Sequence, residues 1–170
     1  GSFVWRSERS GWMHLYHYNA DGTLRRQITD GPWEVRELHG IDEDTGWVYF
    51  SGTERSPIGG DVYRVQLDGS ERTRLSDMPG THHAHFSPNL SRYLDTVSTI
   101  STPSRLYLFA ADGTRIRTVD ENHVPALADF DLSEPEFLQV PTRDGFIMEA
   151  LMLKPPDFDP SRKYPVYQHV

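Results

Sequence analysis

One short phrase recurs three times in this chain and limits the possible folds more than any other feature. It is an apolar and aromatic run that ends in Asp-Gly, at residues 15–22, 62–69 and 106–113. The Asp-Gly pairs begin at Asp21, Asp68 and Asp112, and are therefore 47 and 44 residues apart. Because glycine adopts a positive φ without a Cβ clash, Asp-Gly between two alternating runs predicts a β-hairpin. A repeat of this length predicts an array of similar β-units.

The interval between successive hairpins has room for two further strands. One predicted set of four strands covers residues 35–41, 47–51, 61–66 and 72–75, and the next covers residues 83–87, 93–99, 105–109 and 115–119. Residues 3–6, 14–18 and 24–28 are interpreted as the remainder of an earlier set. Four short strands in about 40–50 residues are typical of a β-propeller blade. We therefore predict an all-β partial β-propeller over residues 1–120, with two to three four-stranded antiparallel blades.

The alternative fold for these residues is a β-sandwich of unrelated strands. Proline and glycine recur every few residues and exclude a continuous helical period, as at Gly31-Pro32 and Pro79-Gly80. Both folds are compatible with that spacing. The repeated phrase favours the propeller, because a sandwich does not require its hairpins to resemble one another.

The repeat stops after Val119, which indicates a boundary. Residues 121–135 are polar and acidic and are interpreted as a linker with one short helical turn at residues 125–131. Alternation returns at residues 136–141 and 146–154, around the Asp-Gly pair at Asp144, and predicts another hairpin. A proline-rich turn follows at residues 155–160, and an apolar run at residues 164–170 predicts a buried strand. Residues 136–170 therefore belong to a second domain.

Composition excludes several classes of function. The 17 basic and 25 acidic residues give a net charge of −8, which argues against nucleic-acid binding. The paired arginines Arg25-Arg26 and Arg72-Arg74 are interpreted as solvated positions on outer strands. The chain has no cysteine, so disulfides, thiolate nucleophiles and cysteine-based zinc sites are excluded. No apolar stretch reaches the about 20 residues that span a bilayer. Gly1-Ser2 resembles a cloning remnant, so we expect a segment of a longer protein.

Three phrases carry a family resemblance, at residues 29–35, 80–88 and 154–166. They resemble the prolyl oligopeptidase family of serine peptidases, in its dipeptidyl peptidase IV branch, and the resemblance extends over essentially the whole chain. It implies that residues 1–120 are the last blades of a β-propeller, and that residues 136–170 are the first strands of an α/β-hydrolase domain.

The resemblance also implies a function for the whole protein. Such enzymes remove Xaa-Pro or Xaa-Ala dipeptides from peptide N-termini with a Ser–Asp–His triad in the hydrolase domain, beneath a propeller that limits access. A pair of propeller glutamates holds the substrate's amine, and a tyrosine helps to stabilise the oxyanion. The family implies a periplasmic or extracellular location in bacteria, allows a homodimer, and calls for no cofactor.

None of these functional residues is assigned to this chain. The sequence contains no Gly-x-Ser-x-Gly elbow, and Tyr164 and Tyr167 precede the position expected for the oxyanion tyrosine. Glu134 and Glu136 lie in or beside the linker and do not match the amine-binding pair. We therefore predict no catalytic, substrate-binding or metal-binding residue, and no peptidase activity for this segment alone.

Histidines offer two further candidate sites. His83 and His85 fall on one face of a predicted strand and His82 on the other. Two imidazoles on one face are too few for a zinc site, so polar strand residues are the favoured interpretation. His169 lies near Tyr167 at the end of a predicted strand, where α/β active sites form, but an ordinary strand residue is favoured.

Tryptophans and glycines give the remaining candidates. Trp12, Trp33 and Trp47 could line a ligand groove, but blade aromatics more often pack between sheets, so we predict core positions. Gly59-Gly60 lacks the strand–helix context of a phosphate loop and is interpreted as a turn.

Three functional hypotheses remain from the sequence. The first is a serine exopeptidase in which this segment acts as gate and scaffold. The second is a related oligopeptidase or acyl-peptide hydrolase, which these residues separate only weakly from the first. The third is a non-enzymatic binding propeller, which predicts further blades after residue 120. An isolated set of blades exposes strand edges, so we also expect it to self-associate.

Overall fold

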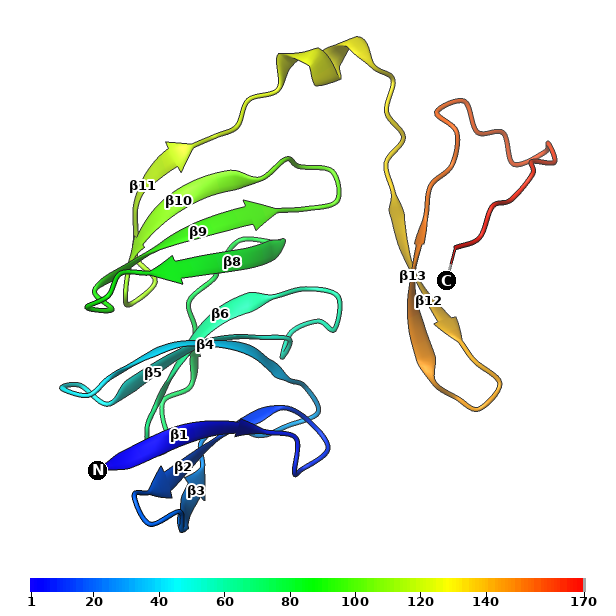
Figure 1. The fold of residues 1–170 in the computed structure, drawn as a ribbon. Helices are drawn as coiled ribbons and strands as arrows, with labels where there is room; N and C mark the ends of the chain where they lie inside the picture. The colour runs from blue at the N-terminus through cyan, green and yellow to red at the C-terminus, as the bar shows by residue number, and fades with distance from the viewer. Residues whose placement is uncertain (170) are drawn as a thin grey trace. The chain divides into compact units, whose positions relative to one another are not determined.

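The structure, a computed structural model, describes residues 1–169 and consists almost entirely of short antiparallel strands (Figure 1). The chain divides into two compact units, residues 1–123 and residues 124–170. Among the described residues no helix has the length and apolar character needed to cross a membrane.

The first unit contains three antiparallel sheets, in each of which every strand pairs with its neighbours in sequence. The first sheet has strands β1 (Ser2–Ser7), β2 (His14–Asn19) and β3 (Leu24–Gln27). The second has β4 (Val35–Asp42), β5 (Trp47–Gly52), β6 (Asp61–Gln66) and β7 (Thr73–Arg74). The third has β8 (Thr81–Phe86), β9 (Arg92–Ser98), β10 (Arg105–Ala110) and β11 (Arg115–Asp120). The prediction of two four-stranded blades and most of a third is confirmed.

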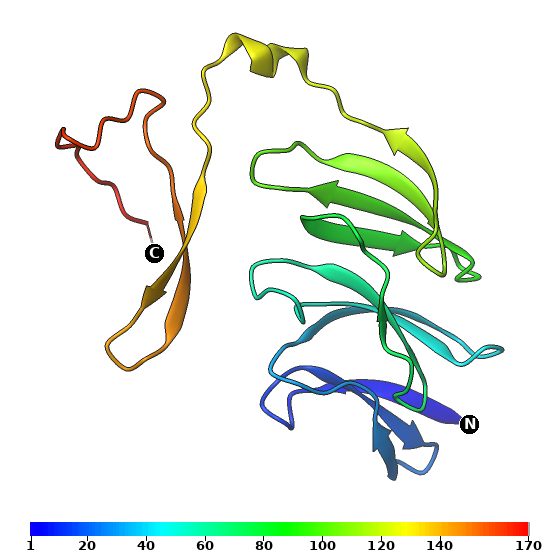
Figure 2. The same ribbon diagram turned by 180° about the vertical axis from the view of Figure 1, so that it is seen from behind.

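The three sheets lie one on another in chain order, as both views show (Figures 1 and 2). Alternate side chains of each strand point to opposite faces, so each inner face contributes every second residue to a shared core. One buried cluster lies between the first and second sheets and includes Leu15, Trp33, Val48 and Phe50. A second cluster includes Tyr49, Val62, Tyr93 and Phe109. Tyr49 and Phe50 are neighbours on β5, so the second sheet is covered on both faces.

The repeated Asp-Gly pairs form the hairpin turns that the sequence predicts. Gly22, Gly69 and Gly113 have φ angles of +84°, +83° and +90°. The Asp68 carboxylate accepts a hydrogen bond from the Ser70 main-chain N–H at 2.9 Å, and the Asp112 carboxylate accepts the equivalent bond from Thr114 at 2.9 Å. These bonds fix the turn that the positive φ permits.

Two of these glycines are also constrained by the preceding sheet. A Cβ on Gly69 would lie 3.2 Å from the Ile28 carbonyl oxygen, and a Cβ on Gly113 would lie 3.1 Å from that of Leu75. Ile28 and Leu75 are themselves 47 residues apart, so the contact recurs with the repeat. Each turn therefore rests on the end of the sheet before it, where only glycine fits without displacement.

We expect Gly69→Ala and Gly113→Ala each to destabilise the chain by about 2–3 kcal/mol, because a positive-φ strain of about 1–2 kcal/mol adds to overpacking. Gly22→Ala is the matched control: its φ of +84° is nearly that of Gly69, but no atom lies within 4 Å of the added Cβ. Gly22→Ala should lower the free energy of unfolding by only about 1–2 kcal/mol. Urea unfolding would measure the three losses, and equal values would contradict a role for the contact between sheets.

Polar contacts at another repeated position close the first and second sheets. The Thr29 hydroxyl lies 3.1 Å from His14 Nδ1, and the Ser76 hydroxyl donates to the Asp61 carboxylate at 2.8 Å. Main-chain bonds link successive sheets at the same end: the Val35 N–H donates to Met13 O at 2.8 Å, and the equivalent His82 N–H donates to Gly60 O at 2.9 Å. The repeat thus includes polar contacts as well as core positions.

The three tryptophans have different environments. Trp33 is buried in the first core cluster, as predicted. Trp47 is partly buried, packs against the second cluster and lies 4.2 Å below the Arg64 guanidinium. Trp12 is 45% exposed, so its predicted core position is wrong. It lies in the loop before β2, outside the alternation that directs strand side chains inward.

The second unit contains a short 3₁₀ helix, η1 (Pro125–Asp129), and a hairpin of β12 (Glu136–Pro141) and β13 (Ile147–Met152). The predicted helical turn and hairpin are confirmed. The predicted strand at 164–170 is wrong for residues 164–169, which form no strand, and residue 170 lies outside the described residues. Tyr167 is 89% exposed. An apolar run becomes a strand only when a neighbouring strand pairs with its backbone N–H and C=O groups. No described residue forms a strand beside residues 164–169.

Candidate functional site

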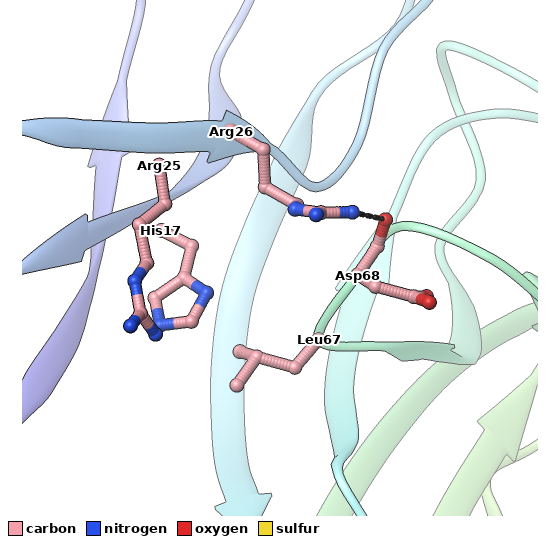
Figure 3. Close-up of a pocket in the computed structure, with 5 residues that line it drawn as sticks. All are labelled: His17, Arg25, Arg26, Leu67 and Asp68. Atoms are coloured by element: carbon pink, nitrogen blue, oxygen red, sulfur yellow. Dashed lines mark hydrogen bonds between the residues drawn. The ribbon is translucent and has the colours of Figure 1, made fainter.

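A hollow of about 350 Å³ opens between the hairpins of the first two sheets (Figure 3). We call it the His17 hollow; it is lined by His17, Arg25, Arg26, Leu67 and Asp68. His17 lies on β2, the two arginines lie on β3, and Leu67 and Asp68 follow β6. The hollow therefore lies where the apolar cluster between these sheets ends.

The arginines surround His17 on the side of β3. Arg26 Nη1 donates to the Asp68 carbonyl oxygen at 2.7 Å and links the two hairpins. Arg25 Nε donates to the Asn19 side-chain oxygen. Figure 3 shows the His17 imidazole beside the Arg25 side chain, with Leu67 on its other side. Both arginines lie on the outer strand β3, as predicted, but the sequence interpretation as simple solvated edge residues missed the hollow that they line.

His17 is the unusual member of this group. It is 5% exposed, and its Nε2 is buried with no hydrogen-bond partner among the described residues. Burial, followed by the charges of Arg25 and Arg26, lowers the pKa of His17 below its usual value. The imidazole is therefore neutral near pH 7, and its buried Nε2 can meet a ligand or a water molecule only if the ring turns.

The repeat explains why a hollow forms at this place. His17 aligns with Arg64 of the second sheet and Leu108 of the third, since the intervals are 47 and 44 residues. Arg64 extends over the Trp47 ring, with its guanidinium carbon 4.2 Å from the ring centroid. The imidazole of His17 is shorter than an arginine side chain, so the space that an arginine would fill at this position remains open. Aligning the three phrases and noting this substitution is the sequence signal that could have identified the site.

A second hollow, of about 330 Å³, adjoins His17 and is lined by acidic as well as apolar residues. Its carboxylates come from Asp42 and Glu43. The Asp42 carboxylate already accepts hydrogen bonds from the Asp44 N–H at 3.1 Å and the Thr45 hydroxyl at 2.6 Å. Of these two hollows, the His17 hollow is the one lined by arginine side chains.

The most buried ion pair lies in the third sheet. His82 Nδ1 on β8 is 2.6 Å from an Asp95 carboxylate oxygen on β9, and both side chains are fully buried. His82 Nε2 is 3.0 Å from the Met78 carbonyl oxygen. A neutral imidazole has one N–H, so only the protonated ring donates to both acceptors at once. Burial alone lowers the pKa of His82, but the hydrogen bond and charge of Asp95, with the Met78 carbonyl, outweigh it and raise this pKa.

The other candidates from the sequence are not brought together. His83 and His85 are exposed on the face of β8 opposite His82, as predicted from alternation. No group of three or more possible metal-ligating residues occurs within the described part of the chain. His169 is exposed, and Glu136 pairs with Lys154 at 2.6 Å. The turn predicted at Gly59-Gly60 lies slightly earlier in the chain: the Gly59 N–H closes it by donating to Ser56 O at 3.2 Å, whereas Gly60 forms a parallel β-bridge with Thr81. The sequence missed Asp95 as the partner of His82, because the two residues meet only through the β8–β9 register.

Successive antiparallel sheets of three, four and four strands are stacked face to face and related by a repeat of 44–47 residues. They define a run of blades from a β-propeller protein. Residues 1–104 match the family model described as the dipeptidyl peptidase IV (DPP IV) N-terminal region. The chain belongs to this family.

Individual relatives agree with the family match. A probable dipeptidyl-aminopeptidase B of Emericella nidulans is 31% identical over 169 residues, covering 94% of this chain and 18% of that protein. A dipeptidyl peptidase 4 of Arthroderma otae is 30% identical over 165 residues, covering 94% of this chain and 21% of that protein. The chain thus spans about a fifth of the length of these curated relatives.

Solved structures agree as well. The crystal structure of Porphyromonas gingivalis dipeptidyl peptidase 4 matches 97% of this chain and 24% of its own, with a TM-score of 0.90 and 36% identity. A putative dipeptidyl aminopeptidase IV from Bacteroides ovatus matches 96% of this chain and 26% of its own, with a TM-score of 0.84 and 20% identity. The second likeness concerns the fold alone.

Proposed function

We propose that this chain is part of a DPP IV-like serine exopeptidase that removes N-terminal Xaa-Pro or Xaa-Ala dipeptides from peptides. The observation that carries the proposal is the 97% coverage by the Porphyromonas gingivalis structure at 36% identity, because it includes residues beyond the blades as well as the blades. Within such an enzyme, residues 1–120 act as gate and scaffold, residues 121–135 link the domains, and residues 136–170 begin the α/β-hydrolase domain.

A binding propeller without enzymatic activity is the less favoured function. It requires more blades after residue 120, whereas the first compact unit ends at residue 123 and a separate hairpin follows. The proposal extends to a peptide substrate, a periplasmic or extracellular location and a homodimeric enzyme, all of which rest on the family resemblance.

Release of a chromophore from an Xaa-Pro anilide tests the proposal. We expect the full-length protein to cleave the substrate and the 170-residue chain to show no activity, because its sequence has no Gly-x-Ser-x-Gly elbow. The matched control is the same anilide with an acetylated N-terminus, which an exopeptidase that holds a free amine should not cleave. Equal cleavage of both substrates would favour an oligopeptidase, and activity of the chain alone would contradict the assignment of no catalytic residue.

A further inference from the structure

We propose that the His17 hollow binds a small tetrahedral oxyanion of the size of phosphate or sulfate. This site is separate from the peptidase chemistry proposed above and does not depend on it. The inference rests on two observations: positive side chains that line a hollow, and a buried ring nitrogen that has no hydrogen-bond partner among the described residues.

The donors come from two adjacent strands and lie on either side of His17 (Figure 3). Arg25 and His17 face one another across β2 and β3 (Figure 3), and Arg26 is held nearby by its bond to the Asp68 carbonyl at 2.7 Å. Arg25 uses Nε for Asn19, which leaves its two terminal nitrogens without a hydrogen-bond partner among residues 1–169. Guanidinium groups donate several N–H bonds in a fixed plane and suit phosphate and sulfate oxygens. A neutral His17 with its proton on Nε2 adds a further donor when the ring turns toward the anion.

The one acidic residue that lines the hollow, Asp68, offsets only part of the charge of these donors. The Asp68 carboxylate accepts bonds from its own turn, at 2.9 Å from the Ser70 N–H and 2.5 Å from the Ser70 hydroxyl. Figure 3 shows this carboxylate directed away from His17 and Arg25. Asp42 and Glu43 line the adjoining hollow and not this one. The hollow therefore has two guanidinium charges and one carboxylate charge among its lining residues.

The volume is sufficient for an anion of this size. A hollow of about 350 Å³ exceeds the about 30 Å³ share of one water molecule several-fold. It has room for an anion of five heavy atoms together with part of its hydration. Because the hollow opens to solvent beside exposed arginines, a free anion reaches it without movement of the sheets.

Isothermal titration calorimetry of the full 170-residue chain tests the proposal, with sodium phosphate, sulfate and acetate each added at a constant ionic strength maintained with chloride. Constant ionic strength removes general screening from the comparison. We expect saturable 1:1 binding of phosphate and sulfate, and at least tenfold weaker binding of planar acetate. Phosphate should also shift the His17 imidazole NMR signals and leave those of the exposed His83 unchanged.

Substitutions locate the site. Arg25→Gln should weaken phosphate binding at least tenfold, whereas Arg117→Gln, on the exposed strand β11, should change it less than twofold. His17→Leu should abolish binding while keeping the fold, because the third sheet has Leu108 at the aligned position. Near-ultraviolet circular dichroism would check the fold of each variant. If His17→Leu unfolds, the phosphate affinity of Arg25→Gln alone tests the proposal. Absence of saturable binding, or equal losses in Arg25→Gln and Arg117→Gln, would overturn the proposal.

Discussion

Replacing Asp95 by alanine is expected to lower the free energy of unfolding by about 3–5 kcal/mol, the usual cost of removing one partner of a buried pair. The Asp95 carboxylate lies 2.6 Å from His82 Nδ1, and both side chains are fully buried. Without it, a protonated imidazole would be buried with only the Met78 carbonyl as its acceptor. The ring would then lose its proton, and the contact between β8 and β9 would loosen.

Urea unfolding of Asp95→Ala and of an exposed control, Asp44→Ala, would measure this effect. Asp44 lies in the β4–β5 turn, and its substitution should change stability by less than about 0.5 kcal/mol. A double-mutant cycle with His82→Ala would isolate the pairwise energy. Exposed ion pairs contribute less than about 1 kcal/mol to the free energy of unfolding. A loss in this range for Asp95→Ala would show that the buried pair contributes little to stability.

The same pair gives a pH dependence with a defined sign. The folded state raises the pKa of His82, so this histidine binds its proton more tightly folded than unfolded. Its contribution to stability is therefore fully present below about 6.5, the unfolded value, and is lost as pH rises through the folded pKa. Comparing the unfolding free energies of the wild type and His82→Gln from pH 5.5 to 8.5 would reveal it. A difference independent of pH would contradict the raised pKa.

Trp33→Ala is the second large effect, with an expected loss of about 3–5 kcal/mol. The indole lies in the core cluster between the first and second sheets. It stacks on Phe50 and Tyr63, with distances between ring centroids of 6.1 Å and 6.2 Å. His14 meets it edge-on at 5.0 Å. Truncation would remove these contacts and leave a cavity at the junction of two sheets, which relaxes only partly because both sheets hold it open.

Trp12→Ala is the matched control, since Trp12 has the same side chain but is 45% exposed. Trp12→Ala should lower the free energy of unfolding by less than about 1 kcal/mol. Thermal and urea unfolding of both variants would give the comparison, with Trp33→Phe expected to lie between them. Similar losses for the two tryptophans would contradict the assignment of Trp33 as the core residue of this junction.

Most of the architecture could be predicted from the repeat. The phrases around Asp21, Asp68 and Asp112 placed the central hairpins, and alternation placed most strand ends within one or two residues. Alternation is a local property, so a one-dimensional sequence carries it directly. Trp12 and residues 164–169 were predicted wrongly for a related reason: apolar character alone does not supply the neighbouring strand or opposing sheet that buries a side chain.

The sites depended on contacts that sequence spacing does not reveal. The pairing of His82 with Asp95 needs the register of β8 against β9, in which Ala84 lies opposite Asp95. The His17 hollow needs two hairpins from different sheets to meet, with Asp68 carrying the Arg26 contact across. Comparing aligned positions of the repeat points to His17, but the burial of its Nε2 without a partner among the described residues is visible only in three dimensions.

Because every sheet pairs only strands adjacent in sequence, the chain has a natural order of assembly during synthesis. A blade can close its own hydrogen bonds as soon as its last strand leaves the ribosome, with no wait for distant partners. The core between two blades forms later, because it needs the next blade, 44 to 47 residues further along. Each newly closed blade thus exposes an apolar face to the cytosol or a chaperone for the time needed to translate one more repeat.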